Sequence, residues 1–196
     1  MNFFKGLLYG REIDGHPAIE TPNWNNIVKT SVFKLDELQN IFGRYCKICL
    51  EDGLISLARF MSQPEVASCP FAAMAFSHEM ESAKSDHLNF SHYVRILDKL
   101  SPLSSALEKV EYMFDVLQID FDNRDILEKG ELSIMLKSLL GGSMSQIQLD
   151  GIVESIWDNL EESFDHEEGK EEGISRAVLT EHLCSLDLQN FITVQF

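Results

Sequence analysis

The chain has 196 residues, of which 44% are apolar and 10% aromatic, a composition typical of a folded protein with one large core or two small ones. Its 32 acidic side chains outnumber 16 basic ones and give a formal net charge of -16, so no basic surface for nucleic acid or anionic lipid is expected. No stretch approaches the roughly 18 consecutive apolar residues of a membrane span. We therefore expect a cytoplasmic protein that reaches membranes only through a partner.

Residues 1–30 are interpreted as a separate N-terminal segment. Five apolar or aromatic side chains lie near its start: Phe3, Phe4, Leu7, Leu8 and Tyr9. The segment either packs on the protein or frays, or it contacts a partner or membrane, and the sequence leaves these alternatives open. Position 2 is Asn2 rather than glycine, so N-myristoylation is not expected.

A pattern of apolar helix, polar loop, short apolar bridge and second helix recurs four times along the chain. Each copy has a candidate for position 8 of a 12-residue EF-hand loop, where paired loops form a two-stranded bridge: Ile55, Leu88, Leu127 and Ile174. We predict an all-α protein with four EF-hand motifs in two paired lobes. The predicted units are an N-terminal lobe with hands one and two at 31–101, a C-terminal lobe with hands three and four at 102–184, and an apolar tail at 185–196.

Three of the four loops lack ligands that calcium requires. Loop one, at 48–59, has Ile48 at position 1 and Arg59 at position 12, where the cation needs a carboxylate and a bidentate glutamate. Loops two and four end in His92 and Val178 at the same position 12. None of these three loops is expected to bind calcium in the ordinary way.

Loop three, "DFDNRDILEKGE" at 120–131, keeps most of a calcium site. Its predicted ligands are the side chains of Asp120, Asp122, Glu128 and Glu131 and the backbone carbonyl of Ile126. Arg124 stands at position 5, where an oxygen belongs, and a charge about 8 Å from a divalent ion costs roughly 4 kcal/mol at an effective dielectric near 20. We predict at most one weakly bound calcium ion. An ion-free loop, or a longer loop beginning near Gln118, remains an alternative.

Amphipathic helices flank loop three, and a third follows after Ser145, which is predicted to form a capping box with Gln148. Their apolar faces are predicted to line a groove for a partner helix: Val110, Met113, Leu136, Leu139, Leu140, Ile156 and Trp157. The alternative is that these are ordinary core residues. The apolar tail residues are expected to cover the groove until a partner displaces them: Leu188, Phe191, Ile192, Val194 and Phe196.

Four stretches, in this order along the chain, resemble the calcineurin B family: "ISLARFMSQPEVASCPF", "HLNFSHYVRIL", "GELSIMLKSLLGGSMSQIQLDGIVESI" and "LDLQNFITVQF". The resemblance covers roughly Ile27 to Phe196. It is strongest to the calcineurin B homologous proteins and more distant to the calcium- and integrin-binding proteins. The resemblance implies a non-catalytic subunit or adaptor that clasps an amphipathic helix of a phosphatase, an exchanger, a channel or an integrin tail.

No motif of an enzyme active site occurs in the sequence, so we do not expect catalysis. We predict an adaptor or regulatory subunit that binds an amphipathic helix of an ion transporter, a channel or a phosphatase, largely independently of calcium. The acidic net charge favours a basic helix as the partner. The alternative is a calcium sensor, or a calcineurin B-type phosphatase regulatory subunit, that uses loop three.

Overall fold

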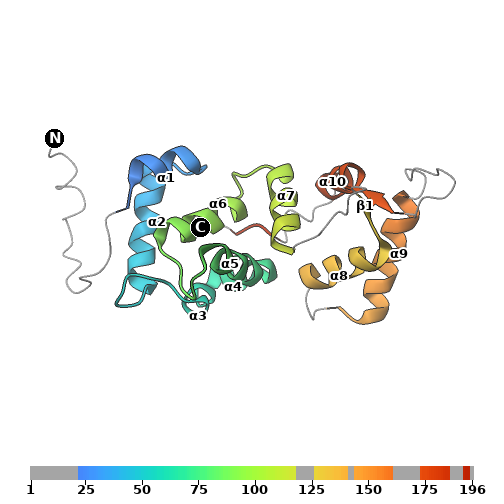
Figure 1. The fold of residues 1–196 in the computed structure, drawn as a ribbon, viewed down its shortest axis with the longest axis horizontal. Coiled ribbons are helices and arrows are strands. Elements are labelled where there is room, and N and C mark those ends of the chain that lie inside the picture. The colour runs from blue at the N-terminus through green and yellow to red at the C-terminus, as the bar shows by residue number, and fades with distance from the viewer. Residues whose placement is uncertain (1–21, 118–125, 141–143, 161–172, 186–191, 195–196) are drawn as a thin grey trace.

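The computed structural model describes residues 22–117, 126–140, 144–160, 173–185 and 192–194. Within these ranges the chain forms ten helices and two short strands, so the predicted all-α class is confirmed (Figure 1). The first seven helices are α1 (Trp24–Thr30), α2 (Leu35–Ile48), α3 (Leu57–Met61), α4 (Pro64–Ala67), α5 (Pro70–Ala83), α6 (Phe90–Leu100) and α7 (Ala106–Leu117). The remaining elements are β1 (Ile126–Leu127), α8 (Lys129–Leu140), α9 (Gln146–Leu160), β2 (Ile174–Ser175) and α10 (Arg176–Ser185).

The four position-8 residues pair as predicted. Ile55 and Leu88 form an antiparallel bridge, in which each backbone N–H donates to the other residue's carbonyl oxygen, at 2.8 and 3.0 Å. Leu127 of β1 lies opposite Ile174 of β2 in a two-stranded antiparallel sheet. All four side chains are fully buried, so each bridge also anchors its loop in the core.

The sequence also predicted a capping box at the start of a helix, and the structure confirms it. The Ser145 N–H donates to Gln148 Oε1 at 2.9 Å, and the Gln148 N–H donates to Ser145 Oγ at 3.4 Å, which forms the capping box of α9. Ser105 and Glu108 form the same reciprocal arrangement at the start of α7. Such boxes satisfy backbone donors that the first helical turn leaves unpaired.

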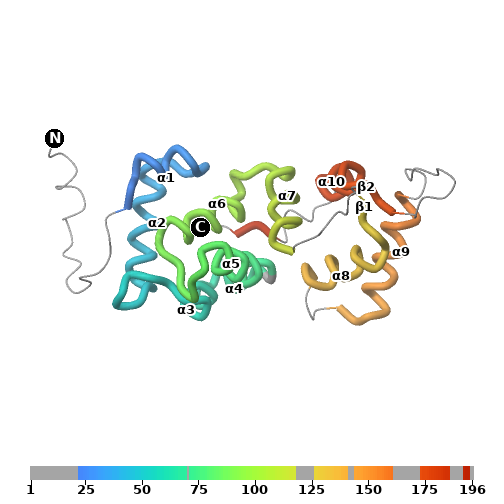
Figure 2. Tube along the Cα trace, viewed as in Figure 1, coloured from blue at the N-terminus to red at the C-terminus, as the bar shows by residue number. Residues whose placement is uncertain are grey.

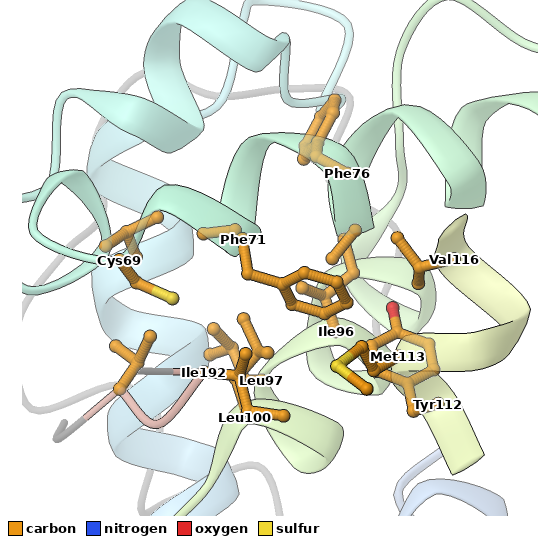
Figure 3. Close-up of a cluster of buried hydrophobic side chains, with 14 of the residues drawn as sticks. Cys69, Phe71, Phe76, Ile96, Leu97, Leu100, Tyr112, Met113, Val116 and Ile192 are labelled. Atoms are coloured by element: carbon orange, nitrogen blue, oxygen red, sulfur yellow. The ribbon is translucent and has the colours of Figure 1, made fainter. Parts of the chain in front are cut away.

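Helix α7 joins two groups of elements. In Figures 1 and 2 it lies between α1–α6 on one side and α8–α10 on the other. It contacts α5 and α6 in the first group and α10 in the second, while α8 contacts both α5 and α9. Its buried residues Met113 and Val116 lie with Phe71 of α5 and Leu97 of α6 in one apolar cluster (Figure 3).

A buried carboxylate ties the end of α6 to the segment between α1 and α2. Asp98 is 7% exposed, and its Oδ1 accepts the Val32 N–H at 2.5 Å. Burial raises the pKa of Asp98 above its usual value, and the Val32 N–H partly opposes this effect. The folded chain therefore holds the Asp98 proton more tightly than the unfolded chain does.

This shift predicts how Asp98→Asn changes stability with pH. A raised folded pKa stabilises the protein below the unfolded value of about 3.9, and this contribution is lost as the pH rises through the folded pKa. Asparagine keeps the acceptor oxygen but does not titrate. The stability of Asp98→Asn relative to wild type should therefore increase across that window, measured as urea midpoints at several pH values. The exposed Asp158→Asn serves as the control, and an equal pH slope in the two variants would contradict the prediction.

Candidate functional site

Loop three is described only in part. Asp120, Asp122 and Arg124 lie outside the described residues. The role of the two aspartates as calcium ligands, and that of Arg124 in weakening calcium binding, stay predictions. Ile126 lies on β1, Glu128 directly precedes α8, and Glu131 lies in the first turn of α8. Oxygen donors suit calcium, but the described residues contain no group of three or more acidic, histidine or cysteine side chains that could hold a metal. A site here therefore depends on the two aspartates.

Glu131 has a structural contact at the position where calcium would need a bidentate ligand. Its Oε2 accepts the backbone N–H of Glu128 at 2.9 Å, so it caps the first turn of α8. A carboxylate has two oxygens, and a cap on one leaves the other able to accept a further contact. Glu131 can therefore serve the helix with or without a cation.

The other three loops are capped by the side chain at position 9. In each, this side chain accepts a hydrogen bond from the backbone N–H at position 12. The pairs are Ser56 with Arg59 at 3.4 Å, Asn89 with His92 at 3.1 Å and Ser175 with Val178 at 3.3 Å. A cap of this kind typically stabilises a helix by about 0.5–2 kcal/mol. The exiting helices of these loops thus begin without a metal-binding carboxylate at position 12.

A tyrosine hydroxyl connects loops one and two. Tyr45 of α2 is fully buried, and its hydroxyl donates to the carbonyl oxygen of Gly53 at 2.6 Å and lies 3.1 Å from that of Leu88. Gly53, at position 6 of loop one, has the positive φ of 77° that the sharp turn requires. Burial raises the pKa of Tyr45 above its usual value, so the hydroxyl stays a neutral donor at physiological pH. It joins carbonyls of two loops that have no complete ligand set.

Sequence reasoning missed the role of Tyr45. The available signal was a tyrosine on the buried face of a helix that leads into a loop without carboxylates at positions 1 and 12. That signal is weak, because buried tyrosines usually find some hydrogen-bond partner.

The predicted groove residues are mostly inside the protein. Five of the seven are at most 7% exposed: Val110, Met113, Leu136, Leu139 and Ile156. Leu140 and Trp157 are partly buried against the core. In this conformation these residues form no open groove, and the alternative interpretation as core residues describes how they pack. A groove at these positions stays a prediction that requires the helices to separate.

Tail residues 192–194 pack against α6 and α7. The Val194 N–H donates to the Leu100 carbonyl oxygen at 2.8 Å, and Lys109 Nζ donates to Thr193 Oγ1 at 2.5 Å. Ile192 and Val194 are only 3% and 1% exposed. Figure 3 shows Ile192 beside Leu97 and Leu100, near the cluster formed by α5, α6 and α7. Of the other predicted tail residues, Leu188, Phe191 and Phe196 lie outside the described residues.

Comparison with known proteins identifies several calcineurin B subunits as relatives. The chain is 30% identical to the calcineurin B subunit of Schizosaccharomyces pombe over 132 residues, which cover 67% of this chain and 74% of that protein. It is 27% identical to the calcineurin B subunit of Naegleria gruberi over 168 residues, covering 85% and 90%. The chain belongs to the calcineurin B family. The type 2 calcineurin B subunit of Dictyostelium discoideum is 23% identical over 138 residues, covering 70% of this chain and 74% of that protein. No protein-family model matches the chain.

Membership in the calcineurin B family confirms the resemblance drawn from the sequence and explains the paired position-8 bridges as EF-hand features. The particular likeness to calcineurin B homologous proteins stays a prediction, because these relatives are named as calcineurin B subunits. Among the helices that the structure describes, none combines the length and the apolar character needed to cross a bilayer.

Proposed function

We propose that this calcineurin B family chain is a non-catalytic EF-hand adaptor or regulatory subunit. It binds an amphipathic helix of a larger protein in a hydrophobic groove, largely independently of calcium. The observation that supports this most is that Tyr45 and the position-9 side chains connect and cap loops with incomplete ligand sets. Side-chain contacts that connect and cap such loops support a role for them other than calcium sensing.

The proposed architecture is four EF-hand motifs in two lobes, with boundaries at 31–101 and 102–184. The two bridges, Ile55 with Leu88 and Leu127 with Ile174, support this division, because paired loops are the unit from which such lobes are built. The segment 1–30 and the tail 185–196 flank the lobes.

The proposed partner is a basic amphipathic helix from an ion transporter, a channel or a phosphatase. An excess of 16 acidic side chains gives an attractive field for such a helix, which speeds association and sets orientation. The groove would involve the predicted apolar faces of α7, α8 and α9, after they part from one another and from the tail. Any membrane association would follow from the partner.

A second candidate function is a calcium sensor or a calcineurin B-type phosphatase subunit that uses loop three. It is favoured by the relatives, each named as a calcineurin B subunit, and by the acidic pair Glu128 and Glu131 at the end of this loop. One weakly bound calcium ion would suffice for this role.

Affinity capture from native extract tests both candidates. The tagged chain is used as bait in parallel with a chelator and with calcium, and bound chains are identified by mass spectrometry. One stoichiometric partner in both conditions is expected. A partner held only with calcium would favour the second candidate, and recovery of a phosphatase catalytic subunit would assign the chain to phosphatase regulation.

Two bait variants show whether captured chains use the proposed groove. Trp157→Asp changes a partly buried groove residue and should lose the partner. Ile134→Asp places the same charge on α8 at a residue that is 68% exposed and outside the predicted groove, so it should keep the partner. Equal capture by the two variants, with folding verified by circular dichroism, would argue against the groove.

A further inference from the structure

Lys109 is a buried cation with no acidic partner in the part of the chain that the structure describes. It is 3% exposed, and its Nζ contacts the neutral hydroxyl of Thr193. No carboxylate among the described residues lies within ion-pair distance of it. Burial lowers the pKa of Lys109, which is the expected response of an ammonium group removed from water. Buried charges in proteins are normally paired, so among the described residues Lys109 is an exception.

The position of Lys109 relates it to partner binding. It lies one helical turn before Met113, so both residues share one face of α7, and Met113 belongs to the predicted groove. Residues 192–194 cover this face: Lys109 Nζ donates to Thr193 Oγ1, and the Val194 N–H donates to the Leu100 carbonyl oxygen. A helix that enters here must displace residues 192–194 and take over their contacts.

We infer that Lys109 is a specificity-determining residue of the partner-binding surface, and that a helix which replaces residues 192–194 brings a carboxylate to pair with it. This inference rests on the proposed function. It adds one acidic position, on the apolar face, to a helix that is otherwise basic and apolar.

The reason is the cost of a buried charge that has no carboxylate partner among the described residues. When Thr193 leaves, Lys109 loses its contact while an apolar helix face excludes water from it. A carboxylate at that position forms a charge-assisted hydrogen bond, which is roughly twice as strong as a neutral one. A helix with leucine or lysine at the same position leaves the ammonium uncompensated or adds repulsion, and is selected against.

The free chain provides the first test. Lys109→Met keeps most of the side-chain volume and removes the charge, so it should raise the Tm of the full chain by roughly 2–4 °C. Lys137→Met, at an exposed position of α8, should leave the Tm nearly unchanged. A Tm that falls in Lys109→Met and not in Lys137→Met would overturn the inference, because Lys109 would then be satisfied without a partner.

The second test selects partners directly. A library of amphipathic helices is displayed, with leucine on the apolar face, lysine on the polar face and one apolar position randomised in each member. Binders are selected separately on the full wild-type chain and on Lys109→Met. Wild type should enrich Asp or Glu at one apolar position, and Lys109→Met should not. The selected acidic helix should bind Lys109→Met about 10- to 100-fold more weakly than wild type.

The other outcomes of the selection separate failure of this inference from failure of the proposed function. Acid-free helices that bind both proteins equally, or acidic helices that bind both equally, would overturn the role of Lys109 and leave helix binding intact. If neither protein selects any helix, the proposed function itself fails, and this inference fails with it.

Discussion

Replacing Arg124 by aspartate is expected to raise the calcium affinity of loop three by about a thousandfold. The substitution removes a cation that costs roughly 4 kcal/mol next to a divalent ion, which corresponds to about three decades of affinity. It also supplies an oxygen at position 5, where EF-hand loops use one. Arg124 lies outside the described residues, so this prediction rests on the sequence. Titration calorimetry, or Trp157 fluorescence during a calcium titration, measures it; Trp157 lies beside Lys129 at the start of α8, with Nζ 5.6 Å from its ring centroid.

Two controls separate loop chemistry from net charge. Lys137→Asp makes the same charge change at an exposed position of α8 and should leave calcium affinity nearly unaltered. Adding Glu131→Gln to Arg124→Asp should abolish the gain, because calcium needs the carboxylate, while glutamine still accepts the Glu128 N–H in the capping box. An equal gain from Lys137→Asp would mean that overall charge, and not position 5, limits binding.

Replacing Tyr45 by phenylalanine is expected to destabilise the chain by about 1–3 kcal/mol. The change removes the only proton of a hydroxyl that contacts the carbonyls of Gly53 and Leu88, and it leaves a buried acceptor without this donor. Urea denaturation followed by circular dichroism measures the loss. Calcium should not restore stability, because loop one has Ile48 and Arg59 at positions 1 and 12.

Tyr112→Phe is the matched control for this prediction. Tyr112 is also buried, at 9% exposure, but its hydroxyl has no hydrogen-bond partner among the described residues. Removing that hydroxyl should be neutral or stabilising, since it ends the cost of an unsatisfied buried group. Equal destabilisation by the two variants would show that ring packing, and not the Tyr45 hydrogen bonds, accounts for the effect.

The sequence alone was sufficient for the repeating elements. The position-8 residues Ile55, Leu88, Leu127 and Ile174 were found from spacing, and the structure pairs them as predicted. The capping box of Ser145 and Gln148 was found in the same way. Such features are readable because helix periodicity, caps and loop register depend on residues only a few positions apart.

The contacts that give this chain its particular character are not local. Tyr45 reaches the Leu88 carbonyl across 43 positions, and Lys109 reaches Thr193 across 84. No spacing rule predicts which buried polar group meets which, because that depends on how distant helices are brought together. The predicted groove illustrates the same limit: apolar periodicity identified the faces of α7, α8 and α9 but not that five of the seven named residues lie buried in the core.

The sequence by itself determined the helical class, the repeated loops, the loss of calcium ligands and the family of this protein, because each is recorded in residue type and spacing. Only the tertiary structure decided that a tyrosine hydroxyl joins loops one and two and that residues 192–194 lie over a buried lysine. The physical reason is that hydrogen bonds and burial are properties of positions in space, and packing brings together residues that the sequence keeps far apart.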